Sequence, residues 1–377
     1  MYLSLDDPKQ RAAILNADLQ RISAWSKKWK VIFNPIKTKL VNFSRKLNPT
    51  YEPLHFGGEL LPNITTHKHL GIILQTDCKW DNHIKNLISK CRVLVSVLKS
   101  YKYRLGRKSL EIMYKSFILP HLDYGDVIWD NCSQTLSNEL EDIHLDALRT
   151  IIGTVKGTSH KLIYKESGFP SLKERRRRHK LILFFKIINK MTPTFLVDML
   201  PPLISDVNPY HRRRPNDRRI PACKTELYKN SFFPSTTYLW NLQPLNIQTS
   251  TSLSQFKHFL KTKDHTPPPY YYLGERRAQI IHTKLRLNMS DLNSHLVSRH
   301  ISDNPRCVCG YQKETTSHYL LHCPNFHMAR NSTINNLHPD YIKTYTLLHG
   351  DRNLSIQTNT TIFNTILNFI LLSERFA

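Results

Sequence analysis

Apolar residues recur at helical spacing along several stretches of the chain. Between Lys9 and Lys30 they lie three or four residues apart, which predicts an amphipathic helix; the positions are Ile14, Leu15, Leu19, Ile22, Trp25 and Trp29. The segment from Trp80 to Lys99 has the same character and predicts a second helix. A third apolar face precedes Gly153, a residue type that readily ends a helix; its members are Leu140, Ile143, Leu148 and Ile151.

Between the first two of these helices the pattern becomes that of strands. Residues 37–44 alternate between apolar and polar side chains, as a strand does. Two more strands are predicted within residues 54–61, because the adjacent Gly57 and Gly58 favour a hairpin turn. Residues 69–74 predict a further strand. The first 77 residues are therefore expected to form a helix packed on a small antiparallel sheet.

The rest of the chain is predicted to be helical. One helix begins after Pro170, another runs from Glu275 to about Asn288, and a last apolar helix covers Ile362–Leu372. That last helix is too short to span a membrane, and it packs against either the rest of the chain or a partner. We expect an α+β fold that is mostly α, in five parts: residues 1–77, 78–155, 156–265, 266–335 and 336–377.

The charge of the chain indicates the chemistry of its partners. There are 54 Lys and Arg against 29 Asp and Glu, a formal net charge of +25, which favours polyanions such as nucleic acid. The apolar fraction of 40% is sufficient for packed cores, so the chain is not a disordered basic tail. The odd number of cysteines, seven, and the absence of an apolar signal core at the N-terminus predict an intracellular protein of the cytoplasm or nucleus, neither secreted nor membrane-bound.

One short stretch carries the residue types of a metal site. Cys307, Cys309, His318 and Cys323 lie within 17 residues, and thiolates with an imidazole are the ligands that zinc prefers in closed tetrahedral sites. Gly310 lets the backbone turn so that two sulfurs face one ion. The gap from His318 to Cys323 is that of a zinc knuckle, whereas the first cysteine pair is unusually close. We predict a structural Zn²⁺ here; the alternative is two buried cysteines beside an ordinary histidine.

Several motifs follow one another in a fixed order in the first part of the chain. They are the pair Trp25 and Trp29, then Asn34–Lys39, His69–Ile72 and Trp80–Ile84. In this order they resemble the reverse transcriptase of a jockey-like non-LTR (LINE) retrotransposon, in the part of the palm that follows the catalytic aspartates. The resemblance implies that the catalytic carboxylates would lie before Met1, in a Tyr/Phe-x-Asp-Asp strand. No catalytic residue is therefore assigned to these 377 residues.

The neighbouring carboxylates Asp6 and Asp7 then correspond to the second acidic pair of the family's Leu-Tyr-x-Ser-x-Asp-Asp-Pro segment. At the start of the predicted helix they also favour the helix dipole and cap its first turn. A metal site formed by these two side chains is the alternative.

Residues from Arg107 to Trp129 resemble the helical thumb of such polymerases. A thumb holds the template–primer duplex, here RNA paired with DNA, through its phosphates, which requires Lys and Arg but no reading of bases. The resemblance and the local charge make five residues candidates for these contacts: Lys99, Lys102, Arg104, Arg107 and Lys108. The alternative for each of them is a solvated helical face.

Three further groups of arginines are candidates for phosphate contact. The first precedes an apolar helix, and because four consecutive residues wrap more than one helical turn, only some of them can face one groove. The first group also has the composition of a nuclear localisation signal. The second lies in a loop rich in Pro and Asn that can become ordered on nucleic acid, and the third follows three tyrosines. The groups are Arg175, Arg176, Arg177 and Arg178; Arg212, Arg213 and Arg214; and Arg276 and Arg277.

The family resemblance extends to the cysteine-rich stretch, because a comparable Cys-x-Cys-Gly…His…Cys element occurs near the end of these polyproteins. It implies a fragment of an RNA-directed DNA polymerase that binds RNA and DNA. The intact enzyme would use Mg²⁺ ions held by carboxylates outside this chain, so we expect the chain alone to be inactive in primer extension. Two alternatives stay open: a stand-alone zinc-dependent RNA- or DNA-binding protein derived from the element, and a protein–protein scaffold in which the zinc unit and the last helix bind a partner. A protein partner or the upstream part of the polyprotein could bind that last helix.

Overall fold

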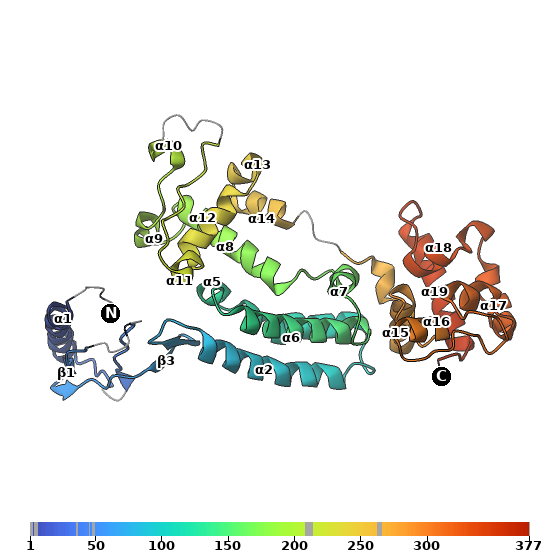
Figure 1. Ribbon diagram of the computed structural model, residues 1–377, viewed down its shortest axis with the longest axis horizontal. Coiled ribbons are helices and arrows are strands. Elements are labelled where there is room, and N and C mark those ends of the chain that lie inside the picture. Colours follow the sequence, from blue (N-terminus) through green and yellow to red (C-terminus); the bar gives the residue numbers. More distant parts are fainter. Residues whose placement is uncertain are drawn as a thin grey trace. The chain divides into compact units, whose positions relative to one another are not determined.

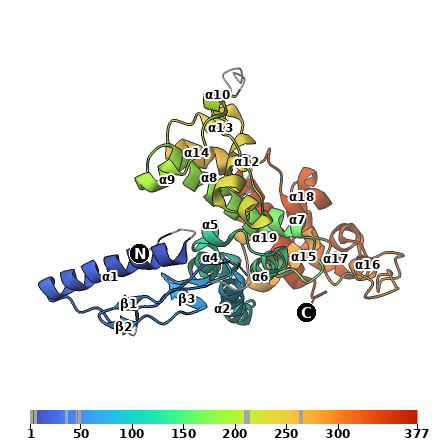
Figure 2. The same cartoon turned by 60° about the vertical axis from the view of Figure 1, so that its left-hand side comes forward.

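The structure is a computed structural model that describes residues 3, 7–34, 37–44, 46, 50–207, 214–261 and 266–376. It consists of two compact units, the first made of residues 1–87 and 132–136 and the second of residues 88–131 and 137–377. Within the described residues the chain is mostly helical, with short antiparallel strands near the N-terminus (Figures 1 and 2). The predicted α+β, mostly α class is confirmed.

The first unit begins with helix α1 (Pro8–Trp29). Asp7 caps it, because its carboxylate accepts a hydrogen bond from the Lys9 backbone, and Pro8 occupies the first turn where its missing N–H is not needed. The left-handed Lys30 ends the helix. Asp7 therefore has the capping role expected from the sequence, whereas Asp6 lies outside the described residues.

The predicted hairpin at Gly57 and Gly58 is confirmed. Strands β1 (His55–Phe56) and β2 (Glu59–Leu60) pair antiparallel across two glycines with positive φ. Apolar side chains from α1 and this hairpin form a small core: Ala12, Leu19, Leu54, Phe56 and Leu61.

Two strand predictions were wrong. Residues 37–44 form no strand; Leu40 alone makes a parallel bridge, to Asn63, because the neighbouring strands pair with each other and leave this segment one partner. The segment predicted as a single strand at 69–74 is a hairpin of β3 (Thr66–His69) and β4 (Ile72–Gln75). Its turn places Leu70 at φ 45° and Gly71 at φ 85°, and a positive φ at leucine could not be read from the apolar pattern.

The region predicted as the thumb is a group of helices that belongs mostly to the second unit, although the first residues of α2 and α6 are counted in the first unit. The long helices α2 and α6 run side by side (Figure 1), joined by ion pairs between Arg92 and Glu139 at 3.2 Å and between Lys99 and Asp146 at 2.7 Å. The elements are α2 (Asp81–Ser100), α3 (Arg107–Met113), the π-helix η2 (Tyr114–Ile118), α4 (Leu119–Asp123), α5 (Asp126–Trp129), α6 (Gln134–Ile152) and α7 (His160–Ser167).

Gly153 ends α6 as the sequence predicted. Its φ of 83° is left-handed, and a Cβ built there would lie 2.5 Å from Cγ1 of Ile280. Only glycine allows this approach of the end of α6 to the C-terminal helices.

The next helices surround α8 (Leu172–Ile188), which starts at Ser171, the N-cap residue. Glu141 of α6 accepts hydrogen bonds from the Leu172 backbone, so a carboxylate neutralises the positive end of α8. A separate core forms here from Leu181, Phe184, Phe185, Trp240, Phe256 and Leu260. The other elements are α9 (Thr194–Asp198), α10 (Ile204–Val207), α11 (Glu226–Lys229), α12 (Phe232–Asn241), α13 (Leu245–Gln248) and α14 (Leu253–Lys261).

The C-terminal helices share one core. The last helix, α19 (Ile356–Leu372), contributes Ile362, Phe363, Ile366 and Phe369, each at most 1% exposed. The other elements are η3 (Pro269–Tyr272), α15 (Arg276–Arg286), α16 (Asn293–Ser298), η4 (His318–His322), η5 (Pro324–Phe326), α17 (His327–Asn331), η6 (Ile334–Asn336), η7 (Pro339–Tyr341) and α18 (Thr344–His349). The apolar face of α19 is thus covered by its own chain, which favours internal packing over a protein partner on that face.

None of the described helices combines the length and the apolar character that crossing a membrane requires.

Candidate metal centre and nucleic-acid interface

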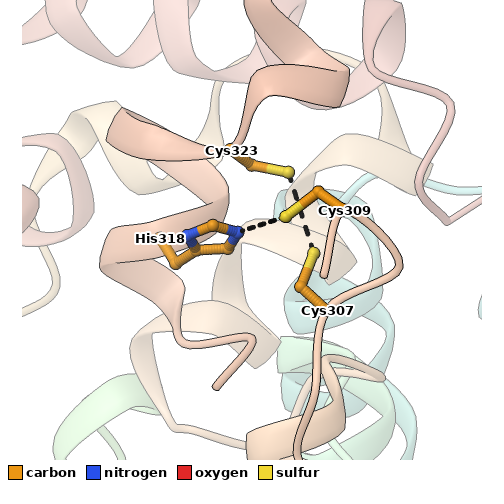
Figure 3. A group of neighbouring side chains, drawn as sticks. All are labelled: Cys307, Cys309, His318 and Cys323. Carbon is orange, nitrogen blue, oxygen red and sulfur yellow. Dashed lines mark hydrogen bonds between the residues drawn. The ribbon is translucent and has the colours of Figure 1, made fainter. Parts of the chain in front are cut away.

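The structure brings Cys307, Cys309, His318 and Cys323 into one group. One donor atom from each residue lies within 4.8 Å of the donors of the others. The sulfurs of Cys307 and Cys323 are 3.7 Å apart, and Sγ of Cys309 lies 3.3 Å from Nε2 of His318. Figure 3 shows the four side chains converging from a loop and from a helical segment. The group can therefore hold a metal ion.

A tight turn presents the first two cysteines. The Cys307 backbone N–H donates to the Tyr311 carbonyl at 2.9 Å, and the Gly310 N–H donates back to the Cys307 carbonyl at 2.9 Å. Gly310 has a φ of 90°, which the sequence anticipated from the need to turn both sulfurs inward.

The other two donors lie at the two ends of the π-helix η4. His318 begins it, and the Cys323 N–H donates to the His318 carbonyl at 2.7 Å. The wider π turn allows two residues five positions apart to face the same point, where the regular 3.6-residue turn would separate them.

The distances suit zinc. A tetrahedral ion about 2.3 Å from each sulfur and about 2.0 Å from an imidazole nitrogen holds sulfurs about 3.8 Å apart and sulfur and nitrogen about 3.5 Å apart. The observed 3.7 and 3.3 Å are close to both values. A donor set of three sulfurs and one imidazole selects zinc over the hard cations, which prefer oxygen.

Burial favours the protonated form of two of the four donors when no ion is bound. Burial raises the pKa of the Cys307 thiol, and it raises the pKa of Cys323 to about 12. A hydrogen bond from the Tyr311 backbone lowers the pKa of Cys309, and burial lowers the pKa of His318. Two buried thiols are costly to ionise without a positive charge beside them, and a metal ion supplies that charge.

Neighbouring residues fix the group in the C-terminal core. The buried Arg330 donates to the carbonyl of Cys323 at 2.8 Å and to that of Leu320 at 2.9 Å. His322 and His327 are exposed and are not members of the group. The metal group thus has four protein donors and needs no fifth.

Three of the candidate phosphate-binding arginines are buried. Arg107 is 1% exposed and bonds to Glu111 and Glu166. Arg176 is 3% exposed and pairs with Asp130 at 2.8 Å. Arg276 is 8% exposed and donates to backbone carbonyls, and burial lowers its pKa to about 10. These side chains serve the interior of the protein, so we leave them out of the proposed interface.

Most of the other clustered arginines are paired. Arg175 holds Asp123 through two hydrogen bonds, and Arg177 and Arg178 both bind Glu174 at 2.7 and 2.8 Å. The expectation that the run cannot all face one groove agrees with this arrangement, but the sequence did not show which acids the arginines pair with.

In the loop group, Arg214 bonds to the Asn241 and Gln243 carbonyls and pairs with Asp217. Arg212 and Arg213 lie outside the described residues.

The remaining candidates lie at the surface. Arg104 and Lys108 are exposed, and Lys102 is half-buried with its ammonium 5.2 Å from the ring centre of Tyr103, a side chain that is 71% exposed. These four residues lie at the junction of α2 and α3, and we call them the junction patch. Lys99 is half-exposed and forms an ion pair with Asp146, and Arg277 donates a hydrogen bond to the Phe376 carbonyl.

The sequence analysis missed a partly buried polar cluster around the buried Asp126. Asp123, Asp126 and His179 bring their donor atoms within 4.8 Å of one another. His179 bonds to Asp126, and burial raises the pKa of that carboxyl despite this bond. Because the guanidinium of Arg175 pairs with Asp123, its positive charge offsets the negative charge of the cluster, and little attraction for a metal cation is left. The sequence did contain a signal for this cluster: aspartates recur at positions 123, 126 and 130, and the arginine run offers charges that could pair with them.

The matched relatives are polymerases of mobile elements. The chain is 26% identical over 171 residues to a probable RNA-directed DNA polymerase from transposon BS of Drosophila melanogaster, covering 43% of this chain and 18% of that protein. It is 26% identical over 140 residues to the RNA-directed DNA polymerase from mobile element jockey of the same species, covering 36% and 15%. The resemblance to jockey-like reverse transcriptases is confirmed.

A third relative, a probable RNA-directed DNA polymerase from transposon X-element of Drosophila melanogaster, is 24% identical over 136 residues, covering 35% of this chain and 15% of that protein. No family model matches the chain. The chain spans less than a fifth of the length of these relatives, so the activity and the partners of the whole proteins come to it only as proposals.

Proposed function

We propose that the chain is a nucleic-acid-binding portion of a non-LTR retrotransposon reverse transcriptase. The similarity to RNA-directed DNA polymerases of mobile elements carries the proposal. In this assignment residues 1–77 are the end of the palm, 78–155 the thumb, 156–265 a basic helical region, 266–335 a zinc-knuckle-like module and 336–377 a helical tail. The last two parts fold together, because they share one core.

The junction patch is the proposed contact with an RNA–DNA template–primer duplex. Two of its three cations, Arg104 and Lys108, are exposed, and the net charge of +25 draws a polyanion to the chain. Backbone phosphates need no more than such cations, and an exposed ring such as that of Tyr103 can lie against a sugar or a base edge. Zn²⁺ in the cysteine group has a structural role in this proposal, and Mg²⁺ belongs to the carboxylates of the intact enzyme. The proposed copying of RNA into DNA would place the protein in the nucleus and the cytoplasm.

An RNA–DNA duplex should bind with a steep dependence on salt. Replacing Arg104 and Lys108 with Gln should weaken binding about tenfold at 100 mM salt and lower the slope of log K against log salt by about 2, one for each lost phosphate contact. Fluorescence anisotropy with a labelled 20-base-pair duplex measures both quantities.

The matched control replaces Lys257 and Lys261 with Gln. These two lysines are also exposed and four residues apart, but both belong to α14, outside the junction patch. The two control substitutions should change the affinity for the duplex less than twofold. Equal losses in both variants would show that net charge alone holds the duplex, and binding that ignores salt would contradict the proposed function and favour a protein scaffold.

A further inference from the structure

The turn that carries the first two cysteines also carries an exposed aromatic ring. Tyr311 is 58% exposed, and its ring lies parallel to the imidazole of His318, with ring centres 4.4 Å apart and an angle of 4° between the planes. One face of the tyrosine is therefore covered by a proposed metal ligand, and the other faces solvent. The ring is held in place before any ligand arrives, because its backbone carbonyl is bonded to Cys307.

The surroundings of this ring are basic and partly apolar. Arg306 and Lys313 are exposed on either side of the turn, and neither side chain forms an ion pair with the described part of the chain. In contrast, nearby Arg375 is committed to the buried Glu314 at 2.7 Å. Val308, at the tip of the turn, is 84% exposed. A flat face flanked by two uncommitted cations suits a ligand that is both aromatic and anionic.

We propose that Tyr311 is a stacking platform for one unpaired nucleobase of a single-stranded nucleic acid, with the adjoining phosphates on Arg306 and Lys313. In a duplex the base faces are covered by their neighbours, so only an unpaired base can lie on the ring. A cationic peptide would be repelled by the two flanking charges. Because every base has a flat π-face, the site should accept any base, in RNA or in DNA. This inference rests on the proposed function and separates a single-strand site from the duplex site at the junction patch.

Stacking on a preordered ring contributes enough to be measured. Alanine substitution of such platforms weakens binding by about tenfold or more per base. The ordering cost is small, because the Tyr311 ring already rests on His318. Leucine at position 311 would still cover His318 but offer no aromatic face, whereas phenylalanine would keep that face.

The direct test is photocrosslinking of the zinc-loaded full chain to a decanucleotide that carries 5-iodouracil. Trypsin cleaves after Arg306 and Lys313, so the peptide 307–313 isolates Tyr311 as its single tyrosine. A crosslink within this peptide, for both the RNA and the DNA oligonucleotide, is the expected result. Crosslinks found elsewhere and absent from this peptide would overturn the proposal.

The affinity test compares three variants, measured with the same decanucleotide without iodine. Tyr311→Leu should weaken single-strand binding about tenfold with unchanged zinc content, and Tyr311→Phe should stay within twofold of the wild type. Tyr345→Leu is the control, because Tyr345 is 71% exposed in α18, one of the C-terminal helices, and its ring packs on His349 rather than on the metal group. It should have no effect.

The outcomes separate the two proposals. Duplex binding that persists while Tyr311→Leu leaves single-strand binding unchanged removes the stacking platform and keeps the proposed function. A wild-type chain that binds neither the duplex nor the single strand would overturn both the stacking platform and the proposed function. If Tyr311→Leu also releases zinc, the ring is a structural cover in that variant, and the crosslink map of the wild type then decides the question.

Discussion

A Cys309→Ser variant should lose its zinc and the order of residues 303–326, while residues up to 260 keep their fold. A serine hydroxyl is a poor ligand for zinc in a site built for a thiolate. With three remaining donors the site should bind zinc far more weakly. The turn at residues 307–310 and the π-helix η4 are joined through the four donors and through the stack of Tyr311 on His318. Zinc in comparable small modules contributes on the order of 10 kcal/mol to folding, so its loss should free both segments.

A colorimetric zinc assay and hydrogen exchange check this result together. The control is Cys223→Ser, because Cys223 is a half-buried thiol that bonds only to the Pro221 carbonyl at 3.1 Å among the described contacts. It should retain one zinc per chain. Stoichiometric zinc in Cys309→Ser would refute the ligand assignment, and unchanged exchange in residues 303–326 after zinc loss would show that the shared C-terminal core holds them without the ion.

The metal group could be predicted from the sequence because its chemistry is local. Four donors that zinc accepts lie within 17 residues, and Gly310 marks the turn that brings two of them together. The stack of Tyr311 on His318 was not predictable in the same way, since it depends on where the π-helix directs the imidazole.

The roles of the arginines could not be predicted, because their partners are distant in sequence. Arg176 finds Asp130 46 residues earlier, and Arg286 finds Glu166 120 residues earlier. A basic run looks the same in sequence whether it faces solvent or a buried carboxylate. The long helices were predicted well because their period is strong, whereas the turn at Leu70 depends on a rare backbone conformation.

Glu166→Leu should destabilise the second unit by about 3–5 kcal/mol, the cost of removing one partner from a buried ion pair. Glu166 is 6% exposed and accepts hydrogen bonds from Arg107 at 3.0 Å and from Arg286 at 2.7 Å. Without it two guanidinium groups stay buried, and only Arg107 keeps another carboxylate, that of Glu111. Urea unfolding followed by circular dichroism measures the loss.

The matched control is Glu139→Leu. Its partner is Arg92, at a comparable 3.2 Å, but both side chains are well exposed, so the loss should stay below about 1 kcal/mol. A variant with Arg107→Met, Glu111→Gln, Glu166→Leu and Arg286→Met should recover most of the stability, since it removes the four buried charges of this network together with their desolvation cost. Equal losses in Glu166→Leu and Glu139→Leu would contradict the role of burial.

The pH dependence gives an independent measure of the same network. Burial alone would raise the pKa of Glu166, but Arg286 and Arg107 together hold it below its ordinary value of 4.5. A carboxyl with a lowered pKa in the folded state contributes stability above pH 4.5 and loses that contribution as the pH falls through its folded pKa. The wild type should therefore lose stability on acidification more steeply than Glu166→Gln. Because Arg107 lies in α3, Glu166 in α7 and Arg286 in α15, this one carboxylate joins the proposed thumb to the C-terminal helices, and its protonation should loosen both at once.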